Sequence, residues 1–142
     1  MTTTPWHFWI IVAIGVLWHL VGVFDYTAFQ FDWAPFMQLA TGRMVQFAEG
    51  MPDWVDGAWA VSVWAGLAGM LLLGLGFALS PLVLSISMIA TVLVALWLTL
   101  FSDPSVLSLA GWIGLLVIWL AAALSVLFWL YARDMHKDGV ID

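Results

Sequence analysis

Hydrophobic residues run through this 142-residue chain in four long stretches, with polar residues gathered between them. The stretches lie at about residues 6–24, 58–79, 82–101 and 107–130. A bilayer core of about 30 Å needs roughly 20 apolar residues in a helix, and a helix satisfies its backbone hydrogen bonds within its own segment. The pattern therefore predicts an all-α, polytopic membrane protein. Its four transmembrane helices form a single domain over residues 1–142.

The short connections between the last three stretches predict how these helices are arranged. Ser80 and Pro81 separate the second stretch from the third, and residues 102–105 separate the third from the fourth. Proline cannot continue a regular helix, and connections this short join antiparallel neighbours. We expect the last three spans to pack beside one another.

A longer polar segment, residues 25–57, follows the first stretch. Within it, the run APFMQLATGRMVQFAEG has apolar residues near helical spacing, which are Phe36, Leu39, Ala40, Met44 and Phe47. This spacing predicts a short amphipathic helix. The helix would lie on the membrane surface or cap the end of the bundle.

Composition supports the assignment to a membrane. Hydrophobic residues make up 65% of the chain and charged residues 8%. A soluble domain has roughly 25% charged residues. Three Lys plus Arg and a net charge of −6 exclude nucleic-acid binding, because such a surface cannot neutralise a phosphate backbone. The absence of cysteine excludes disulfides and thiolate sites.

The distribution of positive charge predicts the orientation. Arg133 and Lys137 follow the last span, whereas Arg43 is the only basic residue in the segment at residues 25–57. By the positive-inside rule, we expect both termini in the cytoplasm and this loop in the periplasm of a bacterial inner membrane. The leading residues MTTTPW lack the positive charge of a secretory signal peptide, so we expect the first span to be retained.

Small and hydroxyl residues indicate where the spans touch, because membrane helices associate through close packing and hydrogen bonds. Three sets recur at helical spacing. The predicted packing residues are Gly15 and Gly22 in the first span, Ser62, Gly66 and Gly69 in the second, and Ser87, Thr91, Ala95 and Thr99 in the third. The hydroxyls of the third set would line a solute path or bond back to their own helix.

His19 is an ionisable residue inside the first apolar stretch, between Gly15 and Gly22. Three interpretations are open. A neutral imidazole would share a hydrogen bond with a neighbouring helix, relay a proton or solute, or ligate a haem or pigment. Asp25 lies about 120° round the helix from His19, which makes it a poor direct partner.

The sequence shows no catalytic pattern and no metal-ligand motif, and no carboxylate lies centrally in a span. We therefore expect no enzyme activity. Five acidic residues between the first two spans would form a solvated surface or bind a divalent cation: Asp25, Asp32, Glu49, Asp53 and Asp56.

The runs PWHFWIIVAIGVLWHLVGVFDY and MPDWVDGAWAVSVWAGLAGMLLL resemble a family of small four-span bacterial inner-membrane proteins that often carry the label "sugar transporter". The resemblance covers about the first half of the chain. It rests on Pro5, Trp6, His7, Trp9, Trp18, Gly22, Phe24, Asp25, Tyr26, Pro52, Trp54, Ala58, Trp59, Trp64 and Gly69. The family usually has asparagine where this chain has His19, and basic residues in the turn that here reads GFALSP.

Two functional hypotheses follow. Abundant packing faces without reactive groups favour a non-catalytic accessory subunit of a larger membrane assembly. The resemblance implies a small-solute, sugar-like transporter working as an oligomer. A lesser alternative is a subunit that contacts a pigment or haem through His19. The expected partners are membrane lipids and other membrane subunits or further copies of this chain.

Overall fold

A computed structural model describes residues 3–38 and 42–142, and these residues form helices without a strand. Four of the helices are long and apolar enough to cross a membrane, which confirms the predicted all-α membrane fold. They are α1 (Phe8–Gln30), α4 (Asp53–Gly74), α5 (Ser80–Leu100) and α6 (Val106–Lys137). Two short helices, α2 (Ala34–Met37) and α3 (Gly42–Glu49), lie between α1 and α4.

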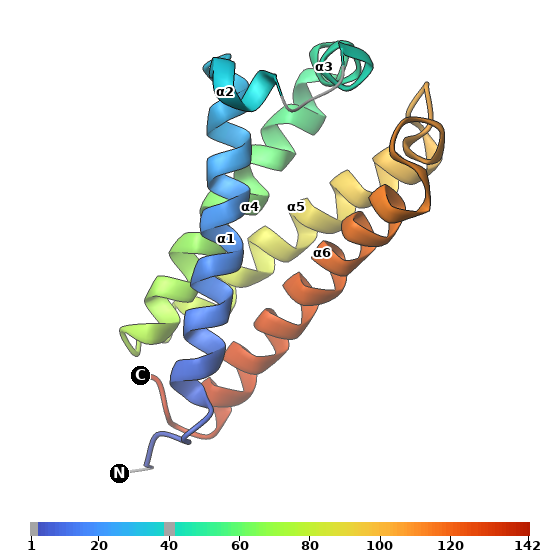
Figure 1. The fold of residues 1–142 in the computed structure, drawn as a ribbon. Helices are drawn as coiled ribbons and strands as arrows, with labels where there is room; N and C mark the ends of the chain where they lie inside the picture. Colours follow the sequence, from blue (N-terminus) through green and yellow to red (C-terminus); the bar gives the residue numbers. More distant parts are fainter. Residues whose placement is uncertain (1–2, 39–41) are drawn as a thin grey trace.

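The four long helices stand in a row, with α1 beside α4, α4 beside α5, and α5 beside α6 (Figure 1). Both chain termini lie at one end of the molecule, and α2 and α3 lie at the other (Figure 1). The pair α1 and α4 diverges from the pair α5 and α6 toward the α2/α3 end (Figure 1). The two helix pairs therefore lie close together at the terminal end and apart at the α2/α3 end.

The predicted short helix in the polar segment is replaced by two helices. Met37 ends α2, and Gly42 begins α3. The predicted helix residues Leu39 and Ala40 lie outside the described residues. The side chains of Phe36 and Met44 also lie outside the described part of the structure. Phe47, the last of the predicted apolar residues, packs against Trp97 of α5, with 6.2 Å between the ring centroids.

Several helix boundaries differ from the hydropathy pattern, most at the end of α6, which continues to Lys137. The first helix continues past its apolar run to Gln30, so Asp25 is helical rather than part of a loop. The second span begins at Asp53, directly after Pro52, which has the extended conformation of a residue before a helix. Hydropathy marks what lipid tolerates, whereas helix ends depend on backbone hydrogen bonds and caps. Helix ends and hydrophobic boundaries therefore need not coincide.

The turn between α4 and α5 also lies earlier than expected. Ser80 and Pro81 do not break a helix but begin α5, because the first turn needs no N–H donor from proline. The chain reverses before them, where Gly76 adopts a φ of +83° that favours glycine. The Ser80 hydroxyl then donates a 2.9 Å hydrogen bond to the carbonyl of Gly69, which ties the two helices together.

The hydrophobic core lies at the terminal end of the row. Its members come from the start of α1, the end of α4, the start of α5 and the end of α6: Phe8, Val12, Met70, Leu73, Leu84, Phe128, Ala132 and Met135. The C-terminal tail completes this core. Ile141 is 2% exposed, and Asp142 pairs with the α4–α5 turn through backbone hydrogen bonds to Gly76 and Ala78 of 2.9 and 2.7 Å.

The seam between α1 and α4 is built by small residues that receive larger ones. The imidazole of His19 lies directly against Gly66, and Met70 lies against Gly15. Val63 lies against Gly22 one turn further along. Each helix thus contributes both the protruding and the receiving positions, which brings the two backbones close together.

The seam between α4 and α5 also uses small residues of α4, and it shares Gly66 with the first seam. Leu84 fills the space above Gly69, and the Ser87 hydroxyl donates a 2.6 Å hydrogen bond to the Ser62 carbonyl. Gly66 faces Ser87 as well as His19. Gly66 therefore lies where α1, α4 and α5 meet.

Replacing Gly66 with leucine is expected to destabilise the fold by about 1–3 kcal/mol, because a Cβ at this position would overlap the His19 ring. The control is Gly57→Leu in the same helix, where a Cβ meets nothing within 4 Å. Unfolding in detergent, followed by circular dichroism, measures both variants. Equal stability of Gly66→Leu and Gly57→Leu would contradict the interlocked seam.

Candidate functional site

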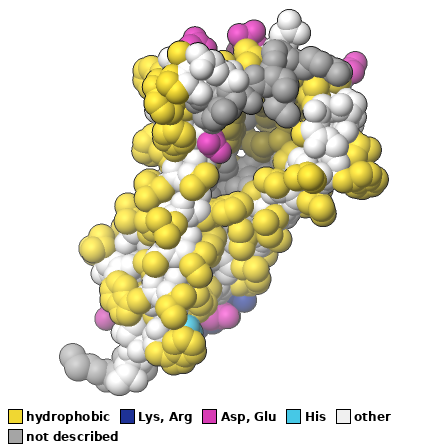
Figure 2. All heavy atoms as spheres, viewed as in Figure 1, with side chains coloured by type: hydrophobic (Ala, Val, Ile, Leu, Met, Phe, Trp, Pro, Cys, Tyr) yellow, Lys and Arg dark blue, Asp and Glu magenta, His cyan; other side chains and the backbone are white. Residues whose placement is uncertain are grey.

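A cavity of about 410 Å³ lies between the two diverging helix pairs. All four long helices line it, with Trp18 and Val21 from α1, Val63 from α4, Val94 from α5 and Ile118 from α6 among the apolar side chains. Figure 2 shows a hollow between the helix pairs on the face viewed. We call this space the interhelical cavity. Its polar lining consists of His19, Asp25, Ser62, Thr91 and Ser125, together with the indoles of Trp18 and Trp59.

His19 stands on α1 at the inner end of the cavity and is 6% exposed. Its ring is wedged between Gly66 of α4 and Phe128 of α6, at 5.7 Å between the two ring centroids. Nδ1 donates a 2.8 Å hydrogen bond to the carbonyl of Gly15, one turn earlier in the same helix. The prediction of a hydrogen bond to a neighbouring helix is therefore wrong, because the ring finds its acceptor within α1.

This hydrogen bond decides which nitrogen of His19 remains available. A carbonyl can only accept, so Nδ1 carries the proton, and in a neutral ring Nε2 is then an acceptor. Nε2 has no hydrogen-bond partner among the described residues, yet it is not sealed from access as the Nε of Arg133 is. The ring therefore presents an unused lone pair at the edge of the cavity.

The hydroxyl groups that line the cavity have already used their protons. Ser62 donates to the carbonyl of Trp59, and Ser125 donates to that of Ala122, each at 2.7 Å. Thr91 donates to the carbonyl of Ser87 at 2.8 Å. Bonding back to the same helix is the usual arrangement for hydroxyls in lipid. Their oxygens, however, still offer lone pairs to the cavity.

The third predicted stripe divides between two roles. Thr91 and Ala95 line the cavity, as the solute-path interpretation required. Ser87 instead lies buried in the seam between α4 and α5. Thr99 donates to the carbonyl of Ala95 at 2.7 Å and accepts from the indole of Trp119 at 3.2 Å, so it joins α5 to α6.

Asp25 also lines the cavity, although the sequence did not predict that it would share a site with His19. It lies on another side of α1, and the two side chains make no direct contact. Both nevertheless line the same cavity, because the divergence of the helix pairs opens a space broad enough to reach both. Asp25 has no hydrogen bond or ion pair within the described part of the chain.

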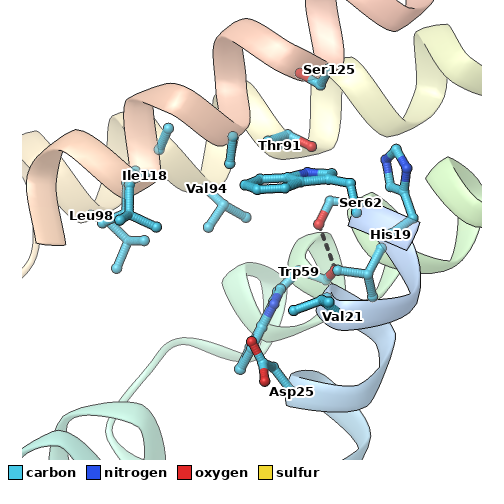
Figure 3. A pocket seen from close by; sticks show the side chains of 16 residues that line it. His19, Val21, Asp25, Trp59, Ser62, Thr91, Val94, Leu98, Ile118 and Ser125 are labelled. Atoms are coloured by element: carbon cyan, nitrogen blue, oxygen red, sulfur yellow. Dashed lines mark hydrogen bonds between the residues drawn. The ribbon is translucent and has the colours of Figure 1, made fainter. Parts of the chain in front are cut away.

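Trp59 lines the same cavity as Asp25, and the two side chains appear in the same part of Figure 3. Its indole is held by Tyr26 and Phe29 of α1, at 5.1 and 6.0 Å between ring centroids. The cavity that Asp25 lines therefore also has an aromatic surface whose position is supported from α1. No sequence motif marks this arrangement, since Trp59 reads equally well as an interfacial anchor.

The described residues contain no group of three or more His, Cys, Asp or Glu side chains placed to hold a metal ion. Ligation of a pigment by His19 is poorly supported by the geometry. The backbone of Gly66 lies against the Cδ2–Nε2 edge of the ring, where a macrocycle would need space. His7 lies at the terminal end of α1, where its Nδ1 shares a 2.8 Å hydrogen bond with the hydroxyl of Tyr131.

His19→Asn and His19→Leu are both expected to change the free energy of unfolding by less than about 1 kcal/mol. Asparagine can still reach the Gly15 carbonyl, and with leucine that carbonyl keeps its backbone helix bond. Thermal unfolding in detergent of both variants and of the parent protein measures this. A loss of several kcal/mol in His19→Leu alone would show that the imidazole holds the fold together.

Comparison of the chain with family models, curated proteins and solved structures gave no match. The resemblance to small four-span inner-membrane proteins accordingly stays a prediction. The four apolar helices show a multi-pass integral membrane protein, and its role has to be inferred from the cavity.

Proposed function

We propose that this chain is a non-catalytic accessory protein of the membrane that holds a small, largely apolar molecule in the interhelical cavity. The observation that carries the proposal is the unpaired Nε2 of His19, a 94%-buried side chain at the edge of a cavity of about 410 Å³. Nε2 keeps access to the cavity that His19 lines, so a bound molecule with a donor gains a hydrogen bond there.

The character of the lining supports ligand binding over chemistry. Ligand sites are mostly apolar with a few convergent polar groups, and volumes of roughly 300–1,000 Å³ are usual. The cavity has this composition. The polar groups do not form a nucleophile–base pair, because His19 donates to Gly15 and the lining hydroxyls donate to helix carbonyls. Binding without catalysis is the role that these contacts favour.

A small-solute transporter acting as an oligomer is the second candidate. The opening of the cavity between α1 and α6 is the observation that favours it, because a solute bound there has a route out of the protein. Alternating access would require the two helix pairs to move about the core at the terminal end. The tail of the chain, which pairs with the α4–α5 turn, opposes such a movement.

We propose further that the protein lies in a bacterial inner membrane with both termini in the cytoplasm. Both termini lie at one end of the molecule (Figure 1). The basic residues at the end of α6 therefore predict the side of the membrane for both termini. Arg133 packs over the ring of Trp129 at 5.1 Å, and Lys137 is exposed at the last turn. Positive charge at this end opposes translocation.

Filling the cavity tests the binding function. Ala121 lines the cavity from α6, so Ala121→Phe should displace the bound molecule, whereas Ala123→Phe on the exposed side of the same helix should not. The protein and both variants are purified from native membranes in mild detergent, and co-purifying small molecules and subunits are identified by mass spectrometry. We expect one small molecule in near-stoichiometric amount that is lost only from Ala121→Phe.

The same purification separates the two candidate roles. Large co-purifying subunits favour the accessory role, and a homo-oligomer whose stability depends on solute favours the transporter. If no small molecule distinguishes Ala121→Phe from Ala123→Phe, the cavity is not a binding site, and the proposal is wrong.

The orientation is tested by reporter fusions. Alkaline phosphatase is expected to be active when inserted near Glu49 and inactive when fused after Asp142, because this reporter folds only in the periplasm. A fluorescent protein that matures only in the cytoplasm gives the complementary readout at both positions. Phosphatase activity of the Asp142 fusion would reverse the proposed orientation.

A further inference from the structure

The polar groups that face the interhelical cavity are almost all acceptors. The Nδ1 proton of His19 and the hydroxyl protons of Ser62, Thr91 and Ser125 are bound to carbonyl oxygens. What these four side chains still offer is lone pairs. Among the described lining residues, the side-chain donors that remain are the indole N–H groups of the two tryptophans. A molecule that matches this lining must itself bring hydrogen-bond donors.

The charge of the lining is also one-sided. Asp25 is the one carboxylate among the described lining residues, and neither lysine nor arginine lies among them. Asp25 has no ion pair in the described part of the chain. Acidic side chains also gather at the α2/α3 end of the molecule (Figure 2), where they raise the local concentration of cations. The complementary ligand therefore carries a single positive charge.

The aromatic surface beside Asp25 narrows the type of cation. Trp59 lines the cavity together with Asp25 (Figure 3), and an indole face attracts an ammonium group as well as apolar surface. The rest of the lining is mainly apolar and includes Val21, Val94 and Ile118. A small inorganic cation would leave these side chains facing empty space, so the charge belongs on an apolar body.

The spacing of the acceptors adds a second requirement. Asp25 and His19 are six residues apart on α1, which corresponds to about 9 Å along the helix axis. One ammonium group cannot contact both. Satisfying the Nε2 of His19 therefore requires another donor at the far end of the same molecule.

We infer that the interhelical cavity binds an amphipathic amine with a second hydrogen-bond donor. The ammonium group pairs with Asp25 beside Trp59, and a hydroxyl or N–H at the other end donates to the Nε2 of His19. The apolar body lies between the helix pairs. The inference rests on the proposed binding function and names the chemical class of its ligand.

A matched set of probes tests the two ends separately. Tyramine carries both an ammonium group and a phenolic hydroxyl at opposite ends of a ring, phenethylamine lacks the hydroxyl, and 4-ethylphenol lacks the amine. Binding to the full chain in nanodiscs is measured by isothermal titration, with empty nanodiscs subtracted. We expect tyramine to bind about tenfold or more tightly than either truncated probe, because each lost contact includes a charged or buried group.

Two variants assign each end of the ligand to its residue. Asp25→Asn should weaken the binding of tyramine and phenethylamine about tenfold and leave 4-ethylphenol unchanged. His19→Leu should remove the advantage of tyramine over phenethylamine, because leucine has no acceptor, whereas the amide oxygen of His19→Asn still accepts. Asp32→Asn is the control, because Asp32 is an exposed acidic residue near the same end, and asparagine tolerates its φ of 48°.

Equal binding of tyramine and 4-ethylphenol, or an Asp25→Asn variant that binds tyramine like the parent, would overturn the cationic end. Equal binding of tyramine and phenethylamine would overturn the second donor. If the parent protein binds none of the three probes, the inferred ligand class is wrong. The proposed binding function would still stand in that case, provided that Ala121→Phe loses a co-purifying molecule that Ala123→Phe retains.

Discussion

The close approach of α1 and α4 at Gly15, Gly22 and Gly66 is the constraint on which the rest of the structure depends. A side chain as broad as imidazole can lie between α1 and α4 only because Gly66 has no Cβ, and Gly15 and Gly22 receive Met70 and Val63 in the same way. In lipid, helices gain little from burying apolar surface against one another, so close packing of this kind is the main source of their association. The direction of α1 relative to α4 follows from this seam.

The cavity exists because the hydrophobic core holds the helices together only at the terminal end of the molecule. Apolar side chains meet at the terminal end, where Phe128 and Ala132 of α6 reach the start of α1. Toward the other end, α6 continues beside α5 and leaves α1 behind (Figure 1). The glycine backbone at Gly111, with a φ of 65° inside α6, changes the course of the helix near that end. Space between the pairs is the geometric result.

The hydroxyl and imidazole groups that line this space donate their protons to helix carbonyls, and their remaining lone pairs have no donor within the described part of the chain. This follows from local rules, because a serine or threonine in a membrane helix finds a carbonyl one turn earlier. The same rule applied to His19 engages Nδ1 and leaves Nε2 without a partner among the described residues. Such a lining favours ligands with hydrogen-bond donors, and each lining hydroxyl keeps its usual hydrogen bond to its own helix.

The four spans and their all-helical nature could be read from the chain alone, because lipid permits few other ways to satisfy a backbone. The residues of the packing seams could also be named, since small residues are what close approach requires. Which seam each would enter could not. Gly66 faces both α1 and α5, and Ser87 and Thr91 in one stripe go to different places, because these outcomes depend on helix rotation and crossing.

The candidate site shows the same division. His19 stood out in the sequence as an ionisable residue within an apolar run, whereas Asp25 and Trp59 carried no local signal that would place them with it. Their proximity depends on the angle at which α5 and α6 leave the other two helices. That angle is set by packing between residues more than fifty positions apart, such as His19 and Phe128. Local hydropathy contains no information about contacts of that range, so the cavity exists only at the level of the folded chain.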